Sequence, residues 1–328
     1  MKPVLHFPTI FLSILTSILG IQLISPIASA QEVSLAINPP IITIQLIPPA
    51  AVSNSLSITN KTDQTTAVSI ELRPFTAAPS ADGRLQFAPQ DKVTTGFLRN
   101  VQILDGNSQI NNITLSPKQQ KILMLRVNIP KDAKSQDYYF SILFINKDNK
   151  KHQSNDKTNT ESILNAGIAT NVIISIGPNP RSTASLEEFS SPTFLNSGPV
   201  PFVIGLKNTS KHFISAYGQI LVKNMFGQTI GKVDLAQTNI LSQTNRYIPD
   251  TKQSYLEQGS TVVPTAVWPE KFLLGFYKAR LELSLSENGP TINREISFLS
   301  FPLPLMGIAI FSLIVIVFIR NRVRKRML

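Results

Sequence analysis

Histidines and paired carboxylates are the side chains from which a catalytic or metal site would be built, and this sequence supplies few of them. Its histidines are His6, His152 and His212; no two have the spacing of metal ligands, and His212 is expected to be an ordinary turn residue. Glu187 and Glu188 are adjacent, so in an extended strand they would point to opposite faces and could not act as an acid/base couple. Gly-x-Ser-x-Gly, Ser-x-x-Lys and P-loop motifs are absent. The sequence therefore predicts a protein that is not an enzyme and that uses no metal or cofactor.

Two features could instead contact a ligand. Residues 146–162, NKDNKKHQSNDKTNTES, are a polar stretch between two predicted strands. Its basic side chains are Lys147, Lys150, Lys151 and Lys157. A loop of this length is usually either functional or disordered, so we interpret it as a solvated hairpin tip or, alternatively, as a contact for an anionic polymer. Trp268, the only tryptophan, is interpreted as a core residue, with an exposed sugar-binding aromatic as the alternative.

The composition narrows the classes of function. The 31 Lys and Arg exceed the 20 Asp and Glu, but six of the cations lie near the two ends of the chain, which leaves 25 against 20 in between. So small an excess, without a clustered basic motif, does not indicate nucleic-acid binding, although it is compatible with weak attraction to anionic polymers or lipid head groups. The chain has no cysteine, so it can form neither a disulfide nor a thiolate site.

The first 30 residues have the pattern of a secretory signal peptide. Lys2 precedes the apolar run IFLSILTSILGIQLI at residues 10–24, and Ala28 and Ala30 satisfy the small-residue rule for signal peptidase. We therefore expect cleavage after Ala30 and export of the chain that follows.

The C-terminal segment has the pattern of a membrane anchor. Residues 301–319, FPLPLMGIAIFSLIVIVFI, carry no charge and are long enough to cross a hydrocarbon core of about 30 Å. A basic tail follows at residues 320–328, with the cations Arg320, Arg322, Arg324, Lys325 and Arg326. By the positive-inside rule this tail stays in the cytoplasm. The predicted location is the cell membrane, with a single transmembrane helix and the N-terminal domains outside the cytoplasm.

The chain between these ends is predicted to be all-β. Period-two alternation, bounded by Pro, Asn, Gly and Ser, recurs about every ten residues, whereas helical periodicity is nearly absent. The turn-rich segment GPNPRS at residues 177–182 is the predicted domain boundary. It separates a first domain at residues 31–178 from a second at residues 183–300.

A repeat indicates that the two domains share one architecture. The segment ITNKTDQTTAVSIEL at residues 58–72 resembles LKNTSKHFISAYGQILV at residues 206–222. In each half, a later strand is followed by a proline, Pro130 or Pro269, and then by a tyrosine, Tyr139 or Tyr277, that begins the next strand. The sequence therefore predicts two tandem immunoglobulin-like β-sandwiches.

Particular side chains suit such a unit. Asn60 and Asn208 each end a strand before a Thr/Ser-rich turn, where the side chain can close an Asx-turn. The alternative is N-glycosylation, because both begin Asn-x-Ser/Thr triplets. Tyr277 follows a glycine and is expected to place its ring in the core and its hydroxyl on a neighbouring carbonyl, as a tyrosine corner does.

The order of signal peptide, two sandwiches, span and basic tail resembles the WxL-interacting family of bacterial surface proteins. The local similarities are the segments TAAPSADGRLQF, AGIATNVIISIG and GFYKARLELSL. This resemblance implies a first domain that binds peptidoglycan and a second that binds partner or host proteins. The first domain is also similar to the N-terminal domain of periplasmic pilus chaperones, which share the sandwich.

Two hypotheses of function follow. The leading one is a membrane-anchored cell-surface binding or scaffold protein whose partners are a cell-wall polymer, another surface protein, or both. The alternative is a chaperone-like assembly factor that binds a partner's strand at an exposed sheet edge.

Overall fold

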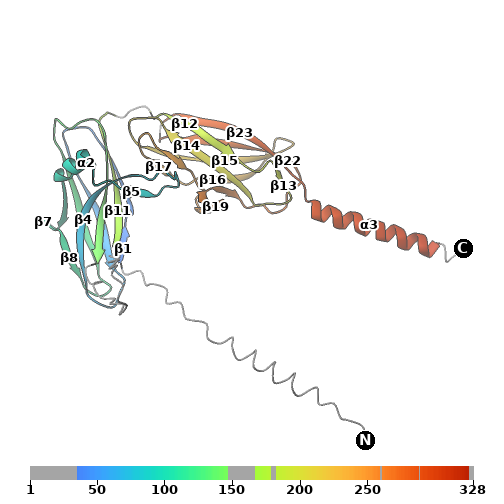
Figure 1. The fold of residues 1–328 in the computed structure, drawn as a ribbon, viewed down its shortest axis with the longest axis horizontal. Helices are drawn as coiled ribbons and strands as arrows, with labels where there is room; N and C mark the ends of the chain where they lie inside the picture. The colour runs from blue at the N-terminus through green and yellow to red at the C-terminus, as the bar shows by residue number, and fades with distance from the viewer. Residues whose placement is uncertain (1–34, 147–166, 179–181, 259–260, 288, 325–328) are drawn as a thin grey trace, which may run out of the picture.

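Two β-sandwiches follow one another along the chain, and a single helix projects beyond the second (Figure 1). The computed structural model describes residues 35–146, 167–178, 182–258, 261–287 and 289–324. The predicted signal peptide at residues 1–30 lies outside these ranges. The predicted all-β sandwich class is confirmed, because each domain consists of facing sheets around its own apolar core.

Domain one consists of a five-stranded and a six-stranded sheet. In order across the first sheet lie β1 (Leu35–Asn38), β3 (Ala50–Asn60), β9 (Gln120–Ile129), β6 (Val101–Asp105) and β7 (Ser108–Gln109). Across the second lie β2 (Ile41–Leu46), β11 (Gly167–Ile176), β10 (Asp137–Asn146), β4 (Thr66–Ala77) and β5 (Leu85–Phe87), with β8 (Asn112–Leu115) also paired to β4. A short helix α2 (Lys92–Phe97) and a 3₁₀ helix η1 (Leu98–Asn100) lead into β6. Asp91 caps α2 by accepting from two of its backbone N–H groups.

Domain two repeats this plan. Its smaller sheet contains β12 (Ala184–Ser190), β14 (Val200–Asn208) and β18 (Asn245–Tyr247), with β21 (Ala266–Trp268) paired to β14. Its larger sheet contains β13 (Phe194–Leu195), β23 (Thr291–Ser300), β22 (Gly275–Ser284), β15 (Ile214–Asn224) and β16 (Thr229–Asp234), with β17 (Thr238–Ile240) paired to β15. A separate hairpin consists of β19 (Tyr255–Gln258) and β20 (Thr261–Pro264).

Strict alternation of side chains assigns each strand an inner and an outer face. In β9, Leu123 and Leu125 are at most 1 % exposed, whereas their neighbour Ile122 is 68 % exposed. Burial of a Leu or Ile side chain contributes about 1.5–3 kcal/mol, so a register slip of one residue would lose many such contributions at once. The alternation therefore fixes which residues point away from the core and remain available for other contacts.

The paired asparagines do close turns, as predicted. Asn60 Oδ1 accepts from the Thr62 N–H at 3.0 Å, and Asn208 Oδ1 accepts from the Ser210 N–H at 2.8 Å. Each amide nitrogen also donates to three backbone carbonyls, and both side chains are fully buried. The Asx-turn prediction is confirmed; an amide nitrogen buried in this way is not accessible for glycosylation in the folded chain.

The two predicted strand-opening tyrosines have different environments. Tyr277 is buried against Phe298, and its hydroxyl donates to the Leu274 carbonyl at 3.2 Å, so the predicted tyrosine corner is confirmed. In β10 the core position belongs to Tyr138, whereas Tyr139 lies on the outer face. Both tyrosines thus lie at the start of a strand, as predicted, but in β10 the neighbouring Tyr138 takes the core position, and one residue is enough to reverse the face of a strand.

Helix α3 (Leu303–Arg324) begins three residues after β23. None of the helices within the described ranges has both the length and the apolar composition needed to cross a bilayer, so the span predicted at residues 301–319 is unsupported there. Arg320 and Arg322 are exposed on this helix. The side chain of Arg324 and all of Lys325 and Arg326 lie outside the described part of the chain.

Candidate binding site between the two domains

The outer face of the six-stranded sheet in domain one packs against turns of domain two. Phe75, Ile173 and Leu241 form a small buried cluster there, with Tyr139 and Phe213 packed against it. Phe75, Tyr139 and Ile173 come from β4, β10 and β11, while Phe213 and Leu241 come from segments flanking β15 and β17 of domain two. The contact between the domains therefore has an apolar centre of its own.

Asp137, the first residue of β10, is the polar centre of this contact. Its Oδ1 lies 2.7 Å from Nδ1 of His212, and its Oδ2 accepts from the Tyr139 hydroxyl at 2.6 Å and from the backbone N–H of Phe213. The Tyr139 hydroxyl in turn accepts from the backbone N–H of Ser242 at 3.1 Å. Asp137 and His212 are almost completely buried, so the hydrogen bonds satisfy polar groups that water does not reach. Burial, reinforced by the negative charge of Asp137, raises the pKa of the Tyr139 phenol, which keeps it protonated as a donor.

This cluster contains Ser175, His212 and Asp137 but lacks the geometry of a catalytic triad. Ser175 Oγ lies 2.8 Å from Nδ1 of His212, the same ring nitrogen that contacts Asp137. In a triad the serine and the carboxylate contact opposite nitrogens, so that the ring can take a proton from one while the other orients it. The arrangement here can join two domains, but it cannot pass a proton from Ser175 through the ring to Asp137. His212 is thus an interdomain contact and not the ordinary turn residue that was expected.

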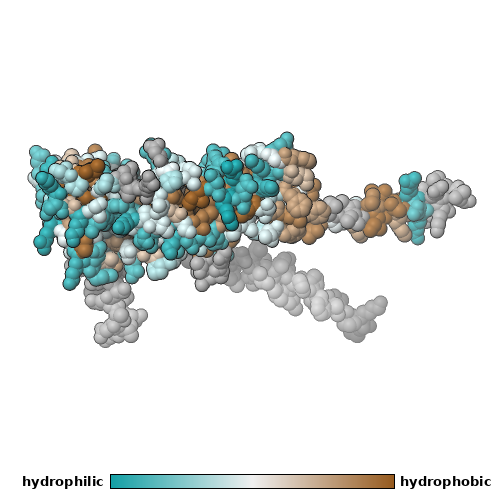
Figure 2. All heavy atoms as spheres, turned by 90° about the horizontal axis from the view of Figure 1, so that it is seen from above, coloured by the Kyte–Doolittle hydropathy of each residue, from teal (hydrophilic) through white to brown (hydrophobic). Residues whose placement is uncertain are grey.

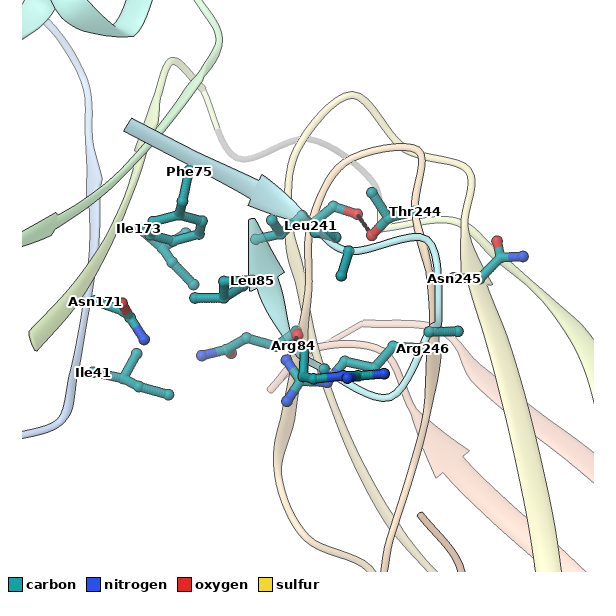
Figure 3. A pocket seen from close by; sticks show the side chains of 15 residues that line it. Ile41, Phe75, Arg84, Leu85, Asn171, Ile173, Leu241, Thr244, Asn245 and Arg246 are labelled. Atoms are coloured by element: carbon teal, nitrogen blue, oxygen red, sulfur yellow. Dashed lines mark hydrogen bonds between the residues drawn. The ribbon is translucent and has the colours of Figure 1, made fainter. Parts of the chain in front are cut away.

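A pocket of about 80 Å³ lies on one side of the contact (Figure 3). Phe75, Ile173 and Leu241 line its apolar side, and the partly exposed Ile41 and Leu85 lie at its edge. Arg84 and Arg246 lie together at its other side in Figure 3. The pocket thus combines an apolar floor with cationic side chains.

The hairpin that joins β4 to β5 contributes one wall of this pocket. Asp82 accepts from Ser80 Oγ and from the backbone and guanidinium of Arg84. Burial would raise the pKa of Asp82, but these hydrogen bonds together hold it below its ordinary value. The hairpin contacts domain two directly, because the Tyr247 N–H donates to the Ala81 carbonyl at 2.9 Å.

Arg246 of β18 lies beneath this hairpin. Its Nη1 donates to the Asn239 carbonyl at 2.8 Å, and a Cβ atom on Gly83 would lie only 2.5 Å from Nη2. Gly83 also has φ +90°, which disfavours other residues. Burial lowers the pKa of the Arg246 guanidinium, an effect that the charge of Asp82 opposes. The positive φ favours glycine at position 83, and the missing Cβ atom leaves room for the Arg246 guanidinium where it lies.

A second, larger cleft of about 690 Å³, lined mostly by polar residues, also lies at the contact. Thr43, Ile44 and Gln45 of β2 line one wall, and Ser175 and His212 lie at its inner end. The rest of the lining consists of Ser182, Ser210, Phe213, Ile214, Ser215, Tyr217, Gln237, Ser286 and Glu287. Ile41 at the start of β2 lines the smaller pocket, so this one strand passes both cavities.

Strand β2 is an edge strand. Among the strands that the structure describes, β11 is its one neighbour, and the two pair in parallel from Ile41 opposite Asn171 to Leu46 opposite Ile176. The carbonyls of Pro40 and Leu46 accept from the N–H groups of Asn171 and Gly177. Since backbone groups alternate in direction along a strand, the even-numbered residues of β2 face β11, and the backbone groups of Ile41 and Thr43 point away from the sheet.

The residues singled out from the sequence do not form this site. Trp268 is 5 % exposed and packs edge-on against Tyr277, with 6.0 Å between the ring centroids. It therefore lies in the core of domain two, which confirms its interpretation as a core residue. Lys147, Lys150, Lys151 and Lys157 lie outside the described residues, as do His6 and His152. Glu187 and Glu188 lie at a bulge in β12, where Glu188 accepts from Ser190 Oγ.

No family model matches this sequence, and no curated protein matches it. Several solved chaperone structures align over most of the chain at low similarity. The class 5 fimbriae chaperone CfaA aligns with 12 % identity and a TM-score of 0.35, covering 80 % of this chain and 98 % of that one. The E. coli chaperone DraB aligns with 10 % identity and a TM-score of 0.35, covering 80 % of this chain and 97 % of that one. The Pseudomonas aeruginosa CupB2 chaperone aligns with 6 % identity and a TM-score of 0.34, covering 79 % of this chain and 98 % of that one. At such values these similarities do not indicate what this chain binds.

Proposed function

We propose that this protein is a non-catalytic binding protein that holds an extended segment of a partner protein along β2, between the two interdomain cavities. The observation that carries the proposal is the position of β2: it is a sheet edge whose outward residues line a pocket at one end and a cleft at the other. An extended segment gains main-chain hydrogen bonds by adding to such an edge, and side-chain pockets then select its sequence.

The cavities suggest what that segment contains. Ile41, Phe75 and Leu241 offer an apolar floor for one apolar side chain, and Arg84, whose side chain is 75 % exposed, lies where an acidic group of the same segment would meet it. The polar cleft at the other end of β2 favours hydroxyl or amide side chains. We therefore expect the bound segment to carry an apolar residue close to an acidic one, followed by polar residues.

The length of β2 and the prolines on its two sides limit how long a bound segment can be. It has six residues, and prolines occupy positions 39, 40, 48 and 49 on its two sides. Prolines at the ends of an edge strand restrict continued pairing and so oppose unlimited aggregation. A short bound segment of about the same length fits this edge better than a long added strand does.

Thr43→Pro tests the proposal directly. Because the Thr43 N–H points away from β11, proline at this position removes an outward donor while leaving the pairing of β2 with β11 in place. Thr43→Val is the matched control, since it keeps the donor and the strand propensity. Decapeptides selected from a displayed random library on the full chain serve as the probe. We expect the selected peptides to bind wild type and Thr43→Val and to lose binding to Thr43→Pro.

Binding that is equal in all three proteins would overturn the proposal. A thermal melt of each variant distinguishes this result from a folding defect. If Thr43→Pro alone melts early, Ile41→Asp repeats the test at the rim of the pocket, where 45 % of the side chain is already exposed.

The remaining features of this proposal come from the sequence. They are a non-enzymatic surface role, export by residues 1–30, attachment to the membrane through residues 301–319, a cytoplasmic tail and membership of the WxL-interacting family. Protease added to intact cells, or to spheroplasts if an outer membrane is present, should remove both domains if this topology is correct. A cell-wall polymer as a second partner would depend on the lysines at residues 147–157, which lie outside the described ranges.

A further inference from the structure

Large apolar side chains gather at the end of domain two from which α3 emerges (Figure 2). We call this surface the apolar end, and its exposed members are Phe194, Met225, Phe226, Phe272, Leu274 and Phe276. Each is between 45 % and 79 % exposed. A contiguous patch of this kind marks an interaction surface, whereas isolated exposed apolar residues do not.

The strand register shows that these side chains are neighbours. Phe194 of β13 and Phe276 of β22 both pair with Leu299 of β23, so the two rings flank the same residue. Met225 reaches to within 3.4 Å of the Cβ position of Gly275, next to Phe276. Phe226 follows Met225 at the tip of the β15–β16 hairpin, and its N–H donates to Asn224 Oδ1. The hairpin geometry thus holds Phe226 outward with little contact to the domain.

Helix α3 continues this apolar surface away from the domain. It starts at Leu303, which is 52 % exposed, and the side chains of Leu313, Ile314, Ile316 and Phe318 are each more than half exposed. At 100° per residue these positions spread around the helix and not along one stripe. Exposed apolar side chains on several sides of the helix favour an apolar surrounding, and the same surrounding would meet the apolar end at the base of the helix.

Basic side chains border the apolar end. Lys223 of β15 and Lys278 of β22 are direct cross-strand partners, and Lys271 precedes Phe272. None of the ion pairs found within the described ranges involves these three lysines. Like charges directly opposite one another are unfavourable unless an anion lies near both. Glu270 is the one carboxylate adjacent to them in sequence, and it accepts from the Lys271 N–H.

From these observations we propose that the apolar end of domain two rests on the surface of a lipid bilayer, with Phe226, Phe272 and Phe276 among the acyl chains and Lys223, Lys271 and Lys278 at anionic head groups. Aromatic side chains with flanking cations are the usual composition of such interfacial contacts. This contact would hold domain two in a fixed orientation to the membrane and turn the cavities beside β2 away from it. The inference is independent of the peptide-binding proposal.

A single fluorescent label tests the contact. Because the chain has no cysteine, Phe226→Cys provides one site for a nitrobenzoxadiazole label on the full chain, and Phe272→Cys provides a second site. Ile122→Cys is the matched control, since Ile122 is also exposed and apolar but lies on β9 of domain one. The labelled proteins are mixed with phosphatidylcholine vesicles, with and without phosphatidylglycerol. We expect labels at 226 and 272 to shift to the blue and to lose most of their quenching by aqueous iodide, and the label at 122 to stay quenchable.

The charge contribution is tested by Lys223→Glu combined with Lys278→Glu. We expect this variant to lose the extra binding that phosphatidylglycerol gives, while the label at 226 still responds to phosphatidylcholine vesicles. The proposal is overturned if labels at 226 and 272 remain as quenchable as the label at 122. It is equally overturned if they are protected without vesicles in a chain that sediments as a dimer, because a second copy would then cover the surface. Fluorescence of the single tryptophan, Trp268, confirms in each sample that domain two is folded.

Discussion

Asp137 joins the two domains through a single carboxylate that accepts from His212 and Phe213 of domain two and from Tyr139 of domain one. Asp137→Ala would leave these donors buried without an acceptor, and each such group costs about 1–3 kcal/mol. We expect the free energy of unfolding to fall by about that amount or more in urea titration. Ser175→Ala is the control, because it removes one neutral contact to His212 and should cost about 1 kcal/mol or less. Equal stability of wild type and Asp137→Ala would contradict this role.

The Tyr139 phenol gives the contact a dependence on alkaline pH. Burial and the charge of Asp137 raise its pKa above the ordinary value of 10.0, so the folded state keeps the proton that the unfolded chain releases. Its contribution is therefore fully present below pH 10 and declines as the pH rises further. We expect the stability advantage of wild type over Tyr139→Phe to be constant up to about pH 9 and to shrink as the pH rises from about 10 to about 11. Urea titrations of both proteins at each pH measure this difference in the free energy of unfolding. A difference that stays constant up to about pH 11 would be inconsistent with this account.

At the scale of the elements, the packing of β16 against β21 depends on a glycine. A Cβ atom at Gly231 would lie 2.5 Å from Nε1 of the buried Trp268 ring. Gly231→Ala should therefore displace the ring, lower stability by about 1–3 kcal/mol and change the emission of this single tryptophan. Gly96→Ala in α2 is the control, because nothing lies within 4 Å of its Cβ position and alanine favours a helix by about 0.5–1 kcal/mol. Unchanged emission and stability in Gly231→Ala would contradict this prediction, because it would show that domain two accommodates the added methyl group without displacing the Trp268 ring.

The strands themselves were largely predictable from the sequence, and their faces were less so. Period-two alternation in KILMLRVNI and YYFSILFIN corresponds to β9 and β10, because inward apolar residues recur at every second position. The pattern YY at the start of β10 offers two aromatic residues for one core position, and the alternation alone does not say which of them is buried. Tyr138 occupies the core because its ring stacks on Phe97 at 3.9 Å, a partner that lies 41 positions away in sequence and cannot be inferred from local pattern.

At the scale of the whole molecule, the contact between the domains could not have been predicted. Asp137, Ser175 and His212 are ordinary polar residues in the sequence, and only the folded chain brings β10, β11 and the turn before β15 together. The segment TAAPSADGRLQF resembles a family pattern, but its physical role is to form the β4–β5 hairpin that meets β18 of domain two. The sequence offers one sign of this contact: Asp137 is a polar residue at the first position of an otherwise largely buried strand.

The central claim is that the outward edge of β2 receives an extended partner segment, and amide hydrogen exchange at Thr43 tests it most directly. The measurement uses the full chain with and without a saturating decapeptide selected on it. Ile44 is the internal control, because its backbone faces β11 in both states. We predict that the peptide slows exchange at Thr43 towards the rate of Ile44, since the added strand accepts the outward N–H. Exchange at Thr43 that is equally fast with and without the bound peptide would contradict the claim.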